Sequence, residues 1–493
     1  MKLISDKNPL DVFKSASNLL NRAVAHTLGP SGANTAVVYG GIQKDAKFQI
    51  INDGKTIIDN LTSEDAEVAL AIQTIRESVL STNSIAGDGT TSTIILINAL
   101  LEELTKNKYK EYSSFEICRN LTNIKKELLG KINLATMPIS EEIPLSMIAE
   151  TSLGSPEYVD LFVDAFEFAG TNGKVLLEKT TDGYPSVEKI DGISFNQFGF
   201  VPELVLNEQG MINTTFGECG TCIVMDDITN QNVILDILKQ SKLNNKPILF
   251  FYQKMSGDIF RIMTGNLLKG GYKVYPISLE QMGNDLYKYG KLLEQITGLE
   301  KYDISKHNLG ENIPLGSISG CIFTKEGVII KPDKDKVEEI AKYIQENKFM
   351  LSTKSAIIKV GAGNAITLEE LFRRFEDAIY SCMNALKNGV CTGGGTTYKI
   401  VAELVRSDNN LGEFSDAIIG AMSSIYKQLL VNCDVIEESV LLLPKLQEDG
   451  SYKLDQNYMA YDSVTTIEQV ITNAFDIVIS IFSTKTLICD PQR

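Results

Sequence analysis

Residues 87–93 read Gly-Asp-Gly-Thr-Thr-Ser-Thr and combine the residue types that bind phosphate groups and a metal ion. They lie between two stretches with helical patterning, 64–82 and 94–104. Glycines let the backbone approach an anion, and the first turn of a helix offers unpaired N–H groups with a favourable dipole. Asp88 adds a carboxylate that can hold a Mg²⁺ bridging phosphate oxygens. The segment predicts a nucleotide-phosphate and metal site, with helix capping by Asp88 and Thr90 as the alternative.

Two more glycine-containing segments have the composition of ligand loops. The sequence Thr-Leu-Gly-Pro-Ser-Gly at 27–32 ends an amphipathic helix that begins near Pro9, and such an end leaves carbonyl groups free for a cation or a ligand. Three glycines at 393–395 directly precede a predicted helix over 398–405, which indicates close approach by a ligand or another backbone. Taken singly, a C-cap with a turn explains the first segment, and a flexible linker explains the second.

A turn is predicted at 52–54, Asn-Asp-Gly, between β-rich runs at 48–51 and 56–58. A hairpin accounts fully for the glycine of this turn. The hairpin does not explain the spacing between Asp53 and Asp88, whereas a resemblance to a known family does explain it.

Together, the ordered segments 27–32, 52–54, 87–93 and 393–395 resemble the nucleotide site of a chaperonin, and most closely that of the group I, GroEL-type family. The similarity runs over essentially the whole chain, clear in the terminal thirds and faint in the middle. It implies an ATPase that assembles into rings, binds non-native proteins and uses ATP to drive capture, encapsulation and release. It also implies a heptameric homo-oligomer, ATP, Mg²⁺ and K⁺ as ligands, and a co-chaperonin lid as a further partner.

The resemblance assigns roles to the matching residues. Asp88 matches the Mg²⁺ ligand, Asp53 matches a carboxylate beside the γ-phosphate, and Asp377 matches the residue that orients or deprotonates the attacking water. Asp462 matches the aspartate that binds the ribose. The nucleotide-binding positions of the family fall on Thr27, Leu28, Gly29, Pro30, Gly54, Gly89, Thr90, Thr91, Ser92, Gly394 and Asp462.

Asp377 lies in the sequence Arg-Phe-Glu-Asp-Ala at 374–378, which resembles the family's Arg-x-Glu-Asp-Ala helix. Without the resemblance, a surface ion pair with Arg373 at i−4 is the simpler interpretation, and an N-cap is the simpler role for Asp462. In the family's mechanism, Mg²⁺ and the helix N-terminus neutralise the phosphates while Asp53 and Asp377 position the water. Because Asp377 belongs to a separate segment, hydrolysis would then depend on closure of that segment.

Several positions depart from the group I pattern. Asn52 stands where the family has lysine, Lys354 and Ser355 stand where hinge glycines are expected, and Ala365 replaces a glutamate that pairs between subunits. The segment 334–353 is also shorter than in the family. These departures put hinge freedom and ring cooperativity in question, and the divergence would fit a copy encoded by a phage.

Apolar residues in the middle third match the family's substrate contacts. Two neighbouring contacts are lost because they fall on Thr264 and Gly265, which would weaken client binding or lid docking. Ordinary core packing is the alternative role for every matching residue. The matching positions are Phe200, Leu204, Val205, Leu235, Leu238 and Phe260.

Composition agrees with this interpretation without deciding it. A chain of 493 residues should hold about three domains. A net charge of −16 argues against partners such as nucleic acid or an anionic membrane surface. We find no signal-peptide pattern or long apolar run and expect a cytoplasmic protein, in a bacterium or a phage-infected host. The Cys-x-x-Cys pair Cys219 and Cys222 lacks a second pair at zinc spacing, so we expect no metal or redox site there.

The positions of the motifs predict nested domains in a mixed α and α/β chain. Nucleotide residues occur near both ends, so 1–134 and 388–493 should form one helical equatorial domain. We assign 135–191 and 355–387 to a small intermediate domain and 192–354 to an α/β apical domain. Two other functions stay open: a passive holdase or scaffold of the same fold without an ATP cycle, and a small-molecule kinase or ligase that uses the 87–93 loop.

Overall fold

The chain folds into two compact units. The first contains Met1–Val163, Leu177–Ser186 and Lys359–Arg493, and the second contains Asp164–Leu176 and Val187–Ile358. The computed structural model describes residues 3–4, 6–39, 47–51, 53–170, 172–196, 198–206, 212, 214–324, 327–349, 351–408, 410–435, 442–447, 452–455 and 458–489.

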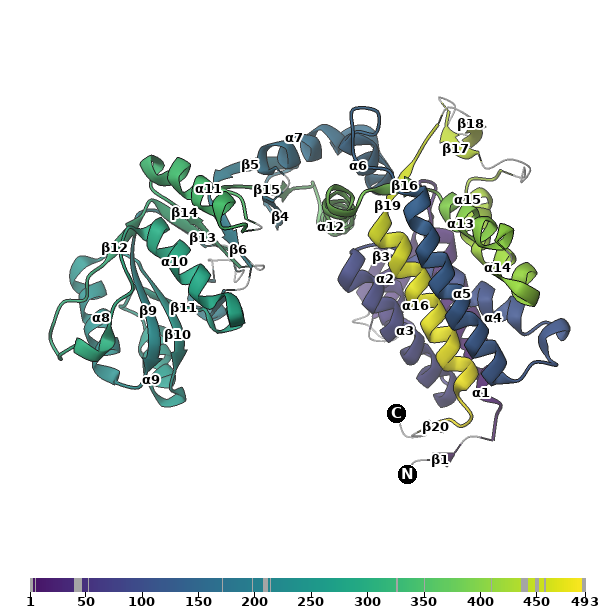
Figure 1. The fold of residues 1–493 in the computed structure, drawn as a ribbon, viewed down its shortest axis with the longest axis horizontal. Helices are drawn as coiled ribbons and strands as arrows, with labels where there is room; N and C mark the ends of the chain where they lie inside the picture. Colours follow the sequence, from purple (N-terminus) through teal and green to yellow (C-terminus); the bar gives the residue numbers. More distant parts are fainter. Residues whose placement is uncertain are drawn as a thin grey trace. The chain divides into compact units, whose positions relative to one another are not determined.

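The first unit is mainly helical (Figure 1). Its helices are α1 (Pro9–Val24), α2 (Gly54–Asn60), α3 (Ala66–Ala86), α4 (Thr90–Leu104), α5 (Ser114–Ala135), α6 (Leu145–Leu153), α12 (Ala365–Asn388), α13 (Thr396–Ser407), α14 (Ser415–Met422), α15 (Ser424–Asn432) and α16 (Val464–Ser483). Its strands are β1 (Leu3–Ile4), β2 (Thr35–Tyr39), β3 (Lys47–Ile51), β16 (Val390–Thr392), β17 (Leu443–Leu446), β18 (Tyr452–Asp455), β19 (Tyr461–Ser463) and β20 (Ile488–Cys489).

The second unit is built on two sheets. Its strands are β6 (Ile193–Phe195), β7 (Gly199–Phe200), β8 (Thr214–Phe216), β9 (Cys219–Ile228), β10 (Ile248–Met255), β11 (Val274–Ser278), β12 (Gly316–Ile318), β13 (Gly320–Thr324) and β14 (Gly327–Lys331). Its helices are α8 (Gln231–Asn244), α9 (Gly257–Leu268), α10 (Leu286–Thr297) and α11 (Val337–Glu346). The division between the units falls within α7 (Val159–Ala169), β4 (Lys174–Lys179), β5 (Ser186–Asp191) and β15 (Lys354–Val360).

One apolar core joins the long helices of the first unit. Helices α1, α3, α4, α5 and α16 all contribute buried side chains to it, and α16 runs beside α5 (Figure 1). Helix α16 is long and apolar enough to cross a membrane by length and composition, but 61% of the relevant window is buried inside the protein. A core helix of a globular unit explains its composition.

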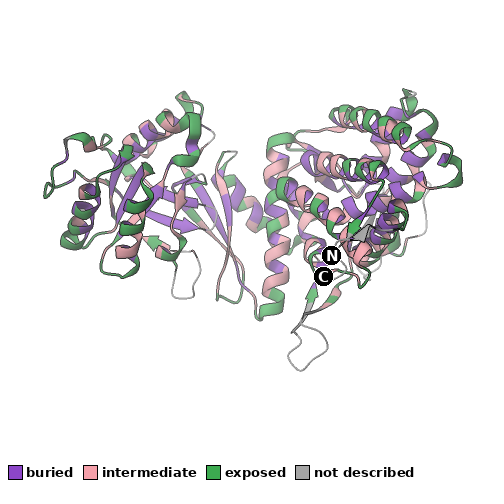
Figure 2. Ribbon diagram, turned by 90° about the horizontal axis from the view of Figure 1, so that it is seen from below, coloured by how far each residue is buried: buried purple, intermediate pink, exposed green. Residues whose placement is uncertain are grey.

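In the second unit, alternate residues of the central strands enter two different cores. The larger sheet has the order β12-β9-β10-β11-β7, with β9, β10 and β11 parallel. Leu249 and Phe251 of β10 pack toward α10 and α11, whereas Phe250 packs toward α8 and α9. This is the period-two alternation of a strand buried on both faces. Figure 2 shows these strands buried and the outward helix surfaces exposed.

The predicted fold class, a mixture of helical and α/β parts, is confirmed. The helix expected to begin near Pro9 does begin there, and the predicted helices over 64–82, 94–104 and 398–405 correspond to α3, α4 and α13. The three-domain division stays a prediction, since the chain separates into two units whose boundaries include 186/187 and 358/359.

The strand predicted at 56–58 is wrong. These residues lie in α2, and Asp53 is the N-cap of that helix, because its carboxylate accepts hydrogen bonds from the backbone N–H groups of Lys55 and Thr56. An aspartate before a glycine suits a helix start as well as a hairpin, and here the capping bonds decide between them. The strand expected at 48–51 is present as part of β3, and Asn52 lies outside the described residues.

The Cys-x-x-Cys pair is not a paired site. Cys219 and Cys222 lie on one strand, and their side chains enter the two different cores on opposite faces of the sheet. Sγ of Cys219 instead lies 4.0 Å from Sγ of Cys321 on β13.

Ser355 is a tether that links β15 to the backbone at Gly192. Its side chain is fully buried, and its hydroxyl donates to the carbonyl oxygen of Gly192 at 3.0 Å. A Cβ atom at Gly192 would lie 2.8 Å from Cγ2 of Ile329, so this glycine is also closely packed. Both residues belong to the second unit, and the bond restrains the backbone at a position where the resemblance predicts a hinge glycine.

We expect Ser355→Ala to lower the free energy of unfolding of the second unit by about 1 kcal/mol, because a buried hydrogen bond is lost. Ser355→Gly should lower it further through added backbone freedom. Denaturant unfolding, with amide exchange at 192–194, measures both effects. Ser317→Ala is the control, since this exposed hydroxyl makes only a 3.4 Å contact with Asp333. Equal midpoints for Ser355→Ala and Ser317→Ala would contradict the tether.

Candidate nucleotide-binding site

Two left-handed glycines shape the loop between α3 and α4. Gly87 ends α3 with φ 73°, and Gly89 precedes α4 with φ 90°. A Cβ atom at Gly87 would lie 2.1 Å from Cγ of Tyr380, and one at Gly89 would lie 2.8 Å from Cγ2 of Val470. Both positions therefore require glycine, by conformation and by space. The turn that they make presents Asp88 at the start of α4.

The first turn of α4 meets the first turn of α2. Helix α4 has no side-chain cap at its N-terminus. A Cβ atom at Gly54 would lie 2.4 Å from Oγ1 of Thr91 and 3.0 Å from Oγ1 of Thr90, so only a glycine permits this approach. The predicted phosphate-binding residues therefore lie at a helix N-terminus that carries hydroxyl groups, with the backbone of α2 beside them. This combination suits the binding of an anion.

The 27–32 loop contacts the same turn. Oγ1 of Thr27 lies 3.4 Å from Oγ1 of Thr91 and donates to the carbonyl oxygen of Val24 at 2.8 Å. Nδ2 of Asn432 donates to the carbonyl oxygens of Ala25 and Leu28, at 2.9 and 2.8 Å. Several carbonyl groups expected to be free at this helix end are therefore already engaged, and Asn432, which the sequence did not single out, fixes the loop.

The rest of the predicted loop is more open. Leu28 is partly buried, and Gly29 and Pro30 are exposed. Gly29 has φ 85°, and a Cβ atom there would lie 2.3 Å from Cδ1 of Leu429. Backbone of this loop remains accessible beside the α4 turn, although fewer carbonyls than expected are free for a cation.

Gly394 and Asp462 come together through a short sheet. Strands β16 and β19 are antiparallel and pair Cys391 with Asp462. The backbone N–H of Gly394 donates to the Asp462 carboxylate, and a Cβ atom at Gly393 would lie 3.1 Å from its Oδ1. The N-cap alternative for Asp462 is wrong, because Ser463 caps α16 by accepting from the N–H of Thr466.

Asp53 is already fully engaged at the start of α2. Besides the two backbone N–H groups, its carboxylate accepts from the Thr56 hydroxyl at 2.5 Å and from Nη1 of Arg373 at 2.9 Å. The predicted alternative, an ion pair between Arg373 and Asp377 on one helix, is therefore wrong. Arg373 reaches from α12 to α2, which leaves Asp377 without this cation.

Four aspartates share one electrostatic environment. Burial raises the pKa of Asp88, and the charge of Asp53 adds to the effect. Burial, together with the charges of Asp88 and Asp53, raises the pKa of Asp377 well above its usual value. Burial and the charge of Asp88 raise the pKa of Asp462 to about 7. Asp88 is the common neighbour, so the site gathers negative charge around the α4 N-terminus.

Such a site fits a divalent cation that arrives with phosphate oxygens. Among the residues that the structure describes, no three His, Cys, Asp or Glu side chains are close enough to hold a metal ion by themselves. Mg²⁺ usually takes one or two protein carboxylates and completes its shell with water and substrate phosphates. Burial and neighbouring negative charges raise the pKa of Asp88 and of Asp377, and a bound cation would reduce this repulsion.

The predicted apical residues differ in accessibility. Val205 and Leu238 are almost fully buried in core clusters. Phe200 stacks edge-on against Phe323, with ring centroids 5.3 Å apart, and Leu204 and Phe260 are partly buried against the same cores. Only Leu235, on α8, is clearly exposed, at 41%. Other exposed apolar side chains on α8 and α9, which sequence reasoning missed, are Leu243, Ile262 and Leu268.

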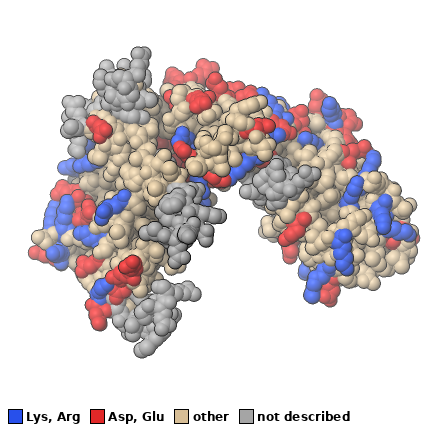
Figure 3. All heavy atoms as spheres, turned by 180° about the vertical axis from the view of Figure 1, so that it is seen from behind, with Lys and Arg blue, Asp and Glu red and all other residues tan. Residues whose placement is uncertain are grey.

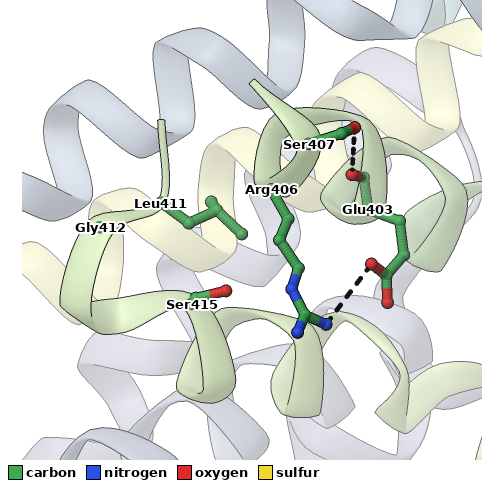
Figure 4. Close-up of a pocket in the computed structure, with 6 residues that line it drawn as sticks. All are labelled: Glu403, Arg406, Ser407, Leu411, Gly412 and Ser415. Atoms are coloured by element: carbon green, nitrogen blue, oxygen red, sulfur yellow. Dashed lines mark hydrogen bonds and ion pairs between the residues drawn. The ribbon is translucent and has the colours of Figure 1, made fainter. Parts of the chain in front are cut away.

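Two surface pockets are lined by residues other than the four aspartates. Figure 4 shows one of about 520 Å³ between α13 and α14, where Arg406 pairs with Glu403 at 3.6 Å. The other, of about 310 Å³, lies in the second unit beside α11. Neither pocket is lined by a predicted site residue.

The comparisons with known proteins agree with this geometry. A sequence model of the TCP-1/cpn60 chaperonin family matches residues 20–224. Among solved structures, the chain is similar to the chaperonin gp146 from the bacteriophage EL 2 (Pseudomonas aeruginosa), crystallised in the presence of ATP-BeFx. In one crystal form the TM-score is 0.71 with 16% identity, and in another it is 0.67 with 17% identity. Each match covers 99% of both chains.

The predicted resemblance to a chaperonin is thus confirmed for the fold along the whole length of the chain. The family match includes the 27–32, 52–54 and 87–93 segments, of which Thr27, Gly54 and the 87–93 loop meet at the α4 N-terminus. The chain therefore has the fold of a chaperonin subunit, and through residues 20–224 it is similar in sequence to the TCP-1/cpn60 chaperonin family.

Proposed function

We propose that this protein is an ATP-dependent chaperonin subunit of the GroEL type, which assembles into homo-oligomeric rings and binds non-native proteins. The observation that carries the proposal is the convergence of Asp53, Asp88, Asp377 and Asp462 beside an uncapped helix N-terminus. Chain segments far apart in sequence supply these groups. The structural relative from a phage, crystallised with an ATP analogue, supports nucleotide binding and a phage origin for this divergent chain.

The charges of the site favour Mg²⁺–ATP over a bare nucleotide. Several aspartates would repel the phosphates, so the cation must arrive with them. Asp88 would hold Mg²⁺, while Thr90, Thr91 and Ser92 cradle the phosphates at the helix N-terminus. When bound, Mg²⁺ would neutralise charge that develops on the transferring phosphoryl group.

Water activation falls to Asp53 and Asp377 in this proposal. Asp53 accepts four hydrogen bonds and is held rigidly, which suits orientation of a group beside the terminal phosphate. The raised pKa of Asp377 makes its carboxylate a stronger proton acceptor once it is ionised. Asp377 is accordingly the general base or the residue that orients the water.

Client binding is assigned to the second unit. Leu235 and Ile262 are 41% and 40% exposed, and Leu243 and Leu268 are exposed at 74% and 58%. Apolar side chains on the outward faces of α8 and α9 suit contact with non-native protein. Elsewhere, acidic and basic side chains are interspersed on the face drawn in Figure 3. Val205 and Leu238 are buried in two different cores and would take part only after those cores rearranged.

Purified protein should hydrolyse ATP with Mg²⁺ and K⁺ and should elute from gel filtration at several times the 54.3 kDa of one chain. It should also suppress aggregation of a denatured client in an ATP-dependent way. A large assembly without ATP turnover would favour the passive holdase, and a monomer with turnover would favour a kinase or ligase. Either result would overturn the proposal.

Asp377→Asn should lower kcat by roughly 10²- to 10⁴-fold, the usual contribution of a positioned general base. Affinity for ADP should stay within about threefold, because the amide keeps the shape of the side chain and removes a repulsive charge. Steady-state turnover and equilibrium nucleotide binding measure the two effects. Glu376→Gln, an exposed neighbour on the same helix, is the matched control. A similar loss in both variants would remove Asp377 from the chemistry.

The raised pKa of Asp462 predicts the direction in which the stability of the protein changes with pH. Its pKa is about 7 in the folded protein and 3.8 in a model compound. Between these values the folded state binds more protons than the unfolded state, so this group makes stability fall as pH rises from about 4 to about 7. The difference of about 3 between these pKa values corresponds to about 4 kcal/mol, so without nucleotide Asp462→Asn should be more stable than the wild type at pH 8 by up to that amount.

Urea unfolding at pH 5 and pH 8 checks this expectation. Asp416→Asn is the opposite control, since Lys108 lowers the pKa of this exposed carboxyl and its effect on the pH slope should have the other sign. An Asp462→Asn variant whose stability changes with pH as steeply as that of the wild type would show that this carboxyl titrates normally.

A further inference from the structure

Helix α12 presents a stripe of polar side chains along one face. Arg373, Asp377, Tyr380 and Asn384 are spaced i−4, i, i+3 and i+7, so they lie one above another on the helix surface. Arg373 precedes the Arg-x-Glu-Asp-Ala motif, whose arginine is Arg374, so the family resemblance assigns it no role.

At the first end of the stripe, Arg373 bonds to α2. Its Nη1 atom lies 2.9 Å from Oδ2 of Asp53 and also donates to Oγ1 of Thr56. The side chains of Arg373 and Asp53 are 31% and 16% exposed. This partial exclusion of water makes the pair stronger than an ordinary surface ion pair.

At the other end, α12 contacts the residues that directly precede Asp88. Nδ2 of Asn384 donates to the carbonyl oxygen of Ala86 at 2.9 Å. The ring of Tyr380 covers Gly87 so closely that a Cβ atom there would lie 2.1 Å from its Cγ. Asp377 lies on the stripe between these contacts and the Arg373 pair. Its position relative to Asp88 is therefore fixed from both sides.

We propose that Arg373 is a positioning residue for Asp377: its ion pair with Asp53 holds α12 against α2 and keeps the Asp377 carboxylate at the α4 N-terminus. The inference rests on the proposed function for its kinetic consequence, but the tether itself exists independently of turnover. Arg373 is the group on α12 that brings positive charge to Asp53. Without it, Asp53 would repel Asp377, and the first end of the stripe would lose its attachment.

The contacts of Arg373 require a positive charge and a donor, but not the shape of a guanidinium group. Both acceptors, Oδ2 of Asp53 and Oγ1 of Thr56, are contacted by the same nitrogen, so the two-pronged fork of a guanidinium is not used. A lysine ammonium carries three donors and one positive charge. Arg373→Lys should therefore retain most of the function that Arg373→Ala loses.

Two measurements test the proposal on the full-length protein. Amide exchange without nucleotide should be roughly tenfold faster over 373–384 in Arg373→Ala than in the wild type, because local opening becomes easier. With ATP, kcat should fall roughly 10- to 100-fold, as expected for a misplaced catalytic group, while ADP affinity changes less than about threefold. Arg374→Ala is the matched control, because Arg374 pairs with Glu370 on the same helix at 3.0 Å.

The outcomes separate this proposal from the broader one. Faster exchange and lower kcat in Arg373→Ala, both restored by Arg373→Lys, support the positioning role. Exchange equal to that of Arg374→Ala, or unchanged kcat despite faster exchange, overturns it. If the wild type itself does not hydrolyse ATP, the proposed function fails, and the exchange experiment still decides whether the Arg373 tether holds α12.

Discussion

The gathering of like charges at the start of α4 is the constraint on which the first unit depends. Burial disfavours ionised carboxylates, and Asp88 adds repulsion to Asp377 and Asp462. A folded protein keeps such groups together where the surrounding structure holds them and where protonation or a bound cation relieves the repulsion. The closely packed glycines Gly54 and Gly89 supply that rigidity, because each leaves no room for a side chain. Repulsion among the aspartates lowers the stability of the fold, and this loss is confined to the site where they meet.

The same constraint explains why the chain is nested. Asp53 and Asp88 come from the N-terminal part, and Asp377 and Asp462 come from the C-terminal part. The core shared by α1, α3, α4, α5 and α16 joins both ends of the chain into one body. A polypeptide that must bring its two ends together around one site can accommodate the remaining residues as an insertion between them. The second unit has separate cores, in keeping with that role.

Sequence patterns predicted the helices well and the side-chain partners poorly. The start of α1 at Pro9 and the positions of α3 and α4 follow from caps and apolar periodicity, which are local signals. The strand expected at 56–58 failed because Asp53 and Gly54 suit a hairpin and a helix start equally. Arg373 was assigned to its helical neighbour, since no local signal reveals an acceptor 320 residues away. The exposed Ile262 escaped notice for a related reason: burial is decided by the tertiary fold.

Two side-chain contacts, one in each unit, restrain the segments that they join. Ser355, where the resemblance predicts a hinge glycine, bonds to the carbonyl oxygen of Gly192, and Arg373 forms an ion pair between α12 and α2. Each contact favours one arrangement of its own unit by an amount of the order of 1 kcal/mol or more. A cycle that relies on domain movement must overcome both restraints, and only a ligand with different affinities for the two arrangements can do so. Binding of Mg²⁺–ATP among the aspartates would supply such a difference, because a cation held by Asp88 would compete with Arg373 for the nearby negative charge of Asp53.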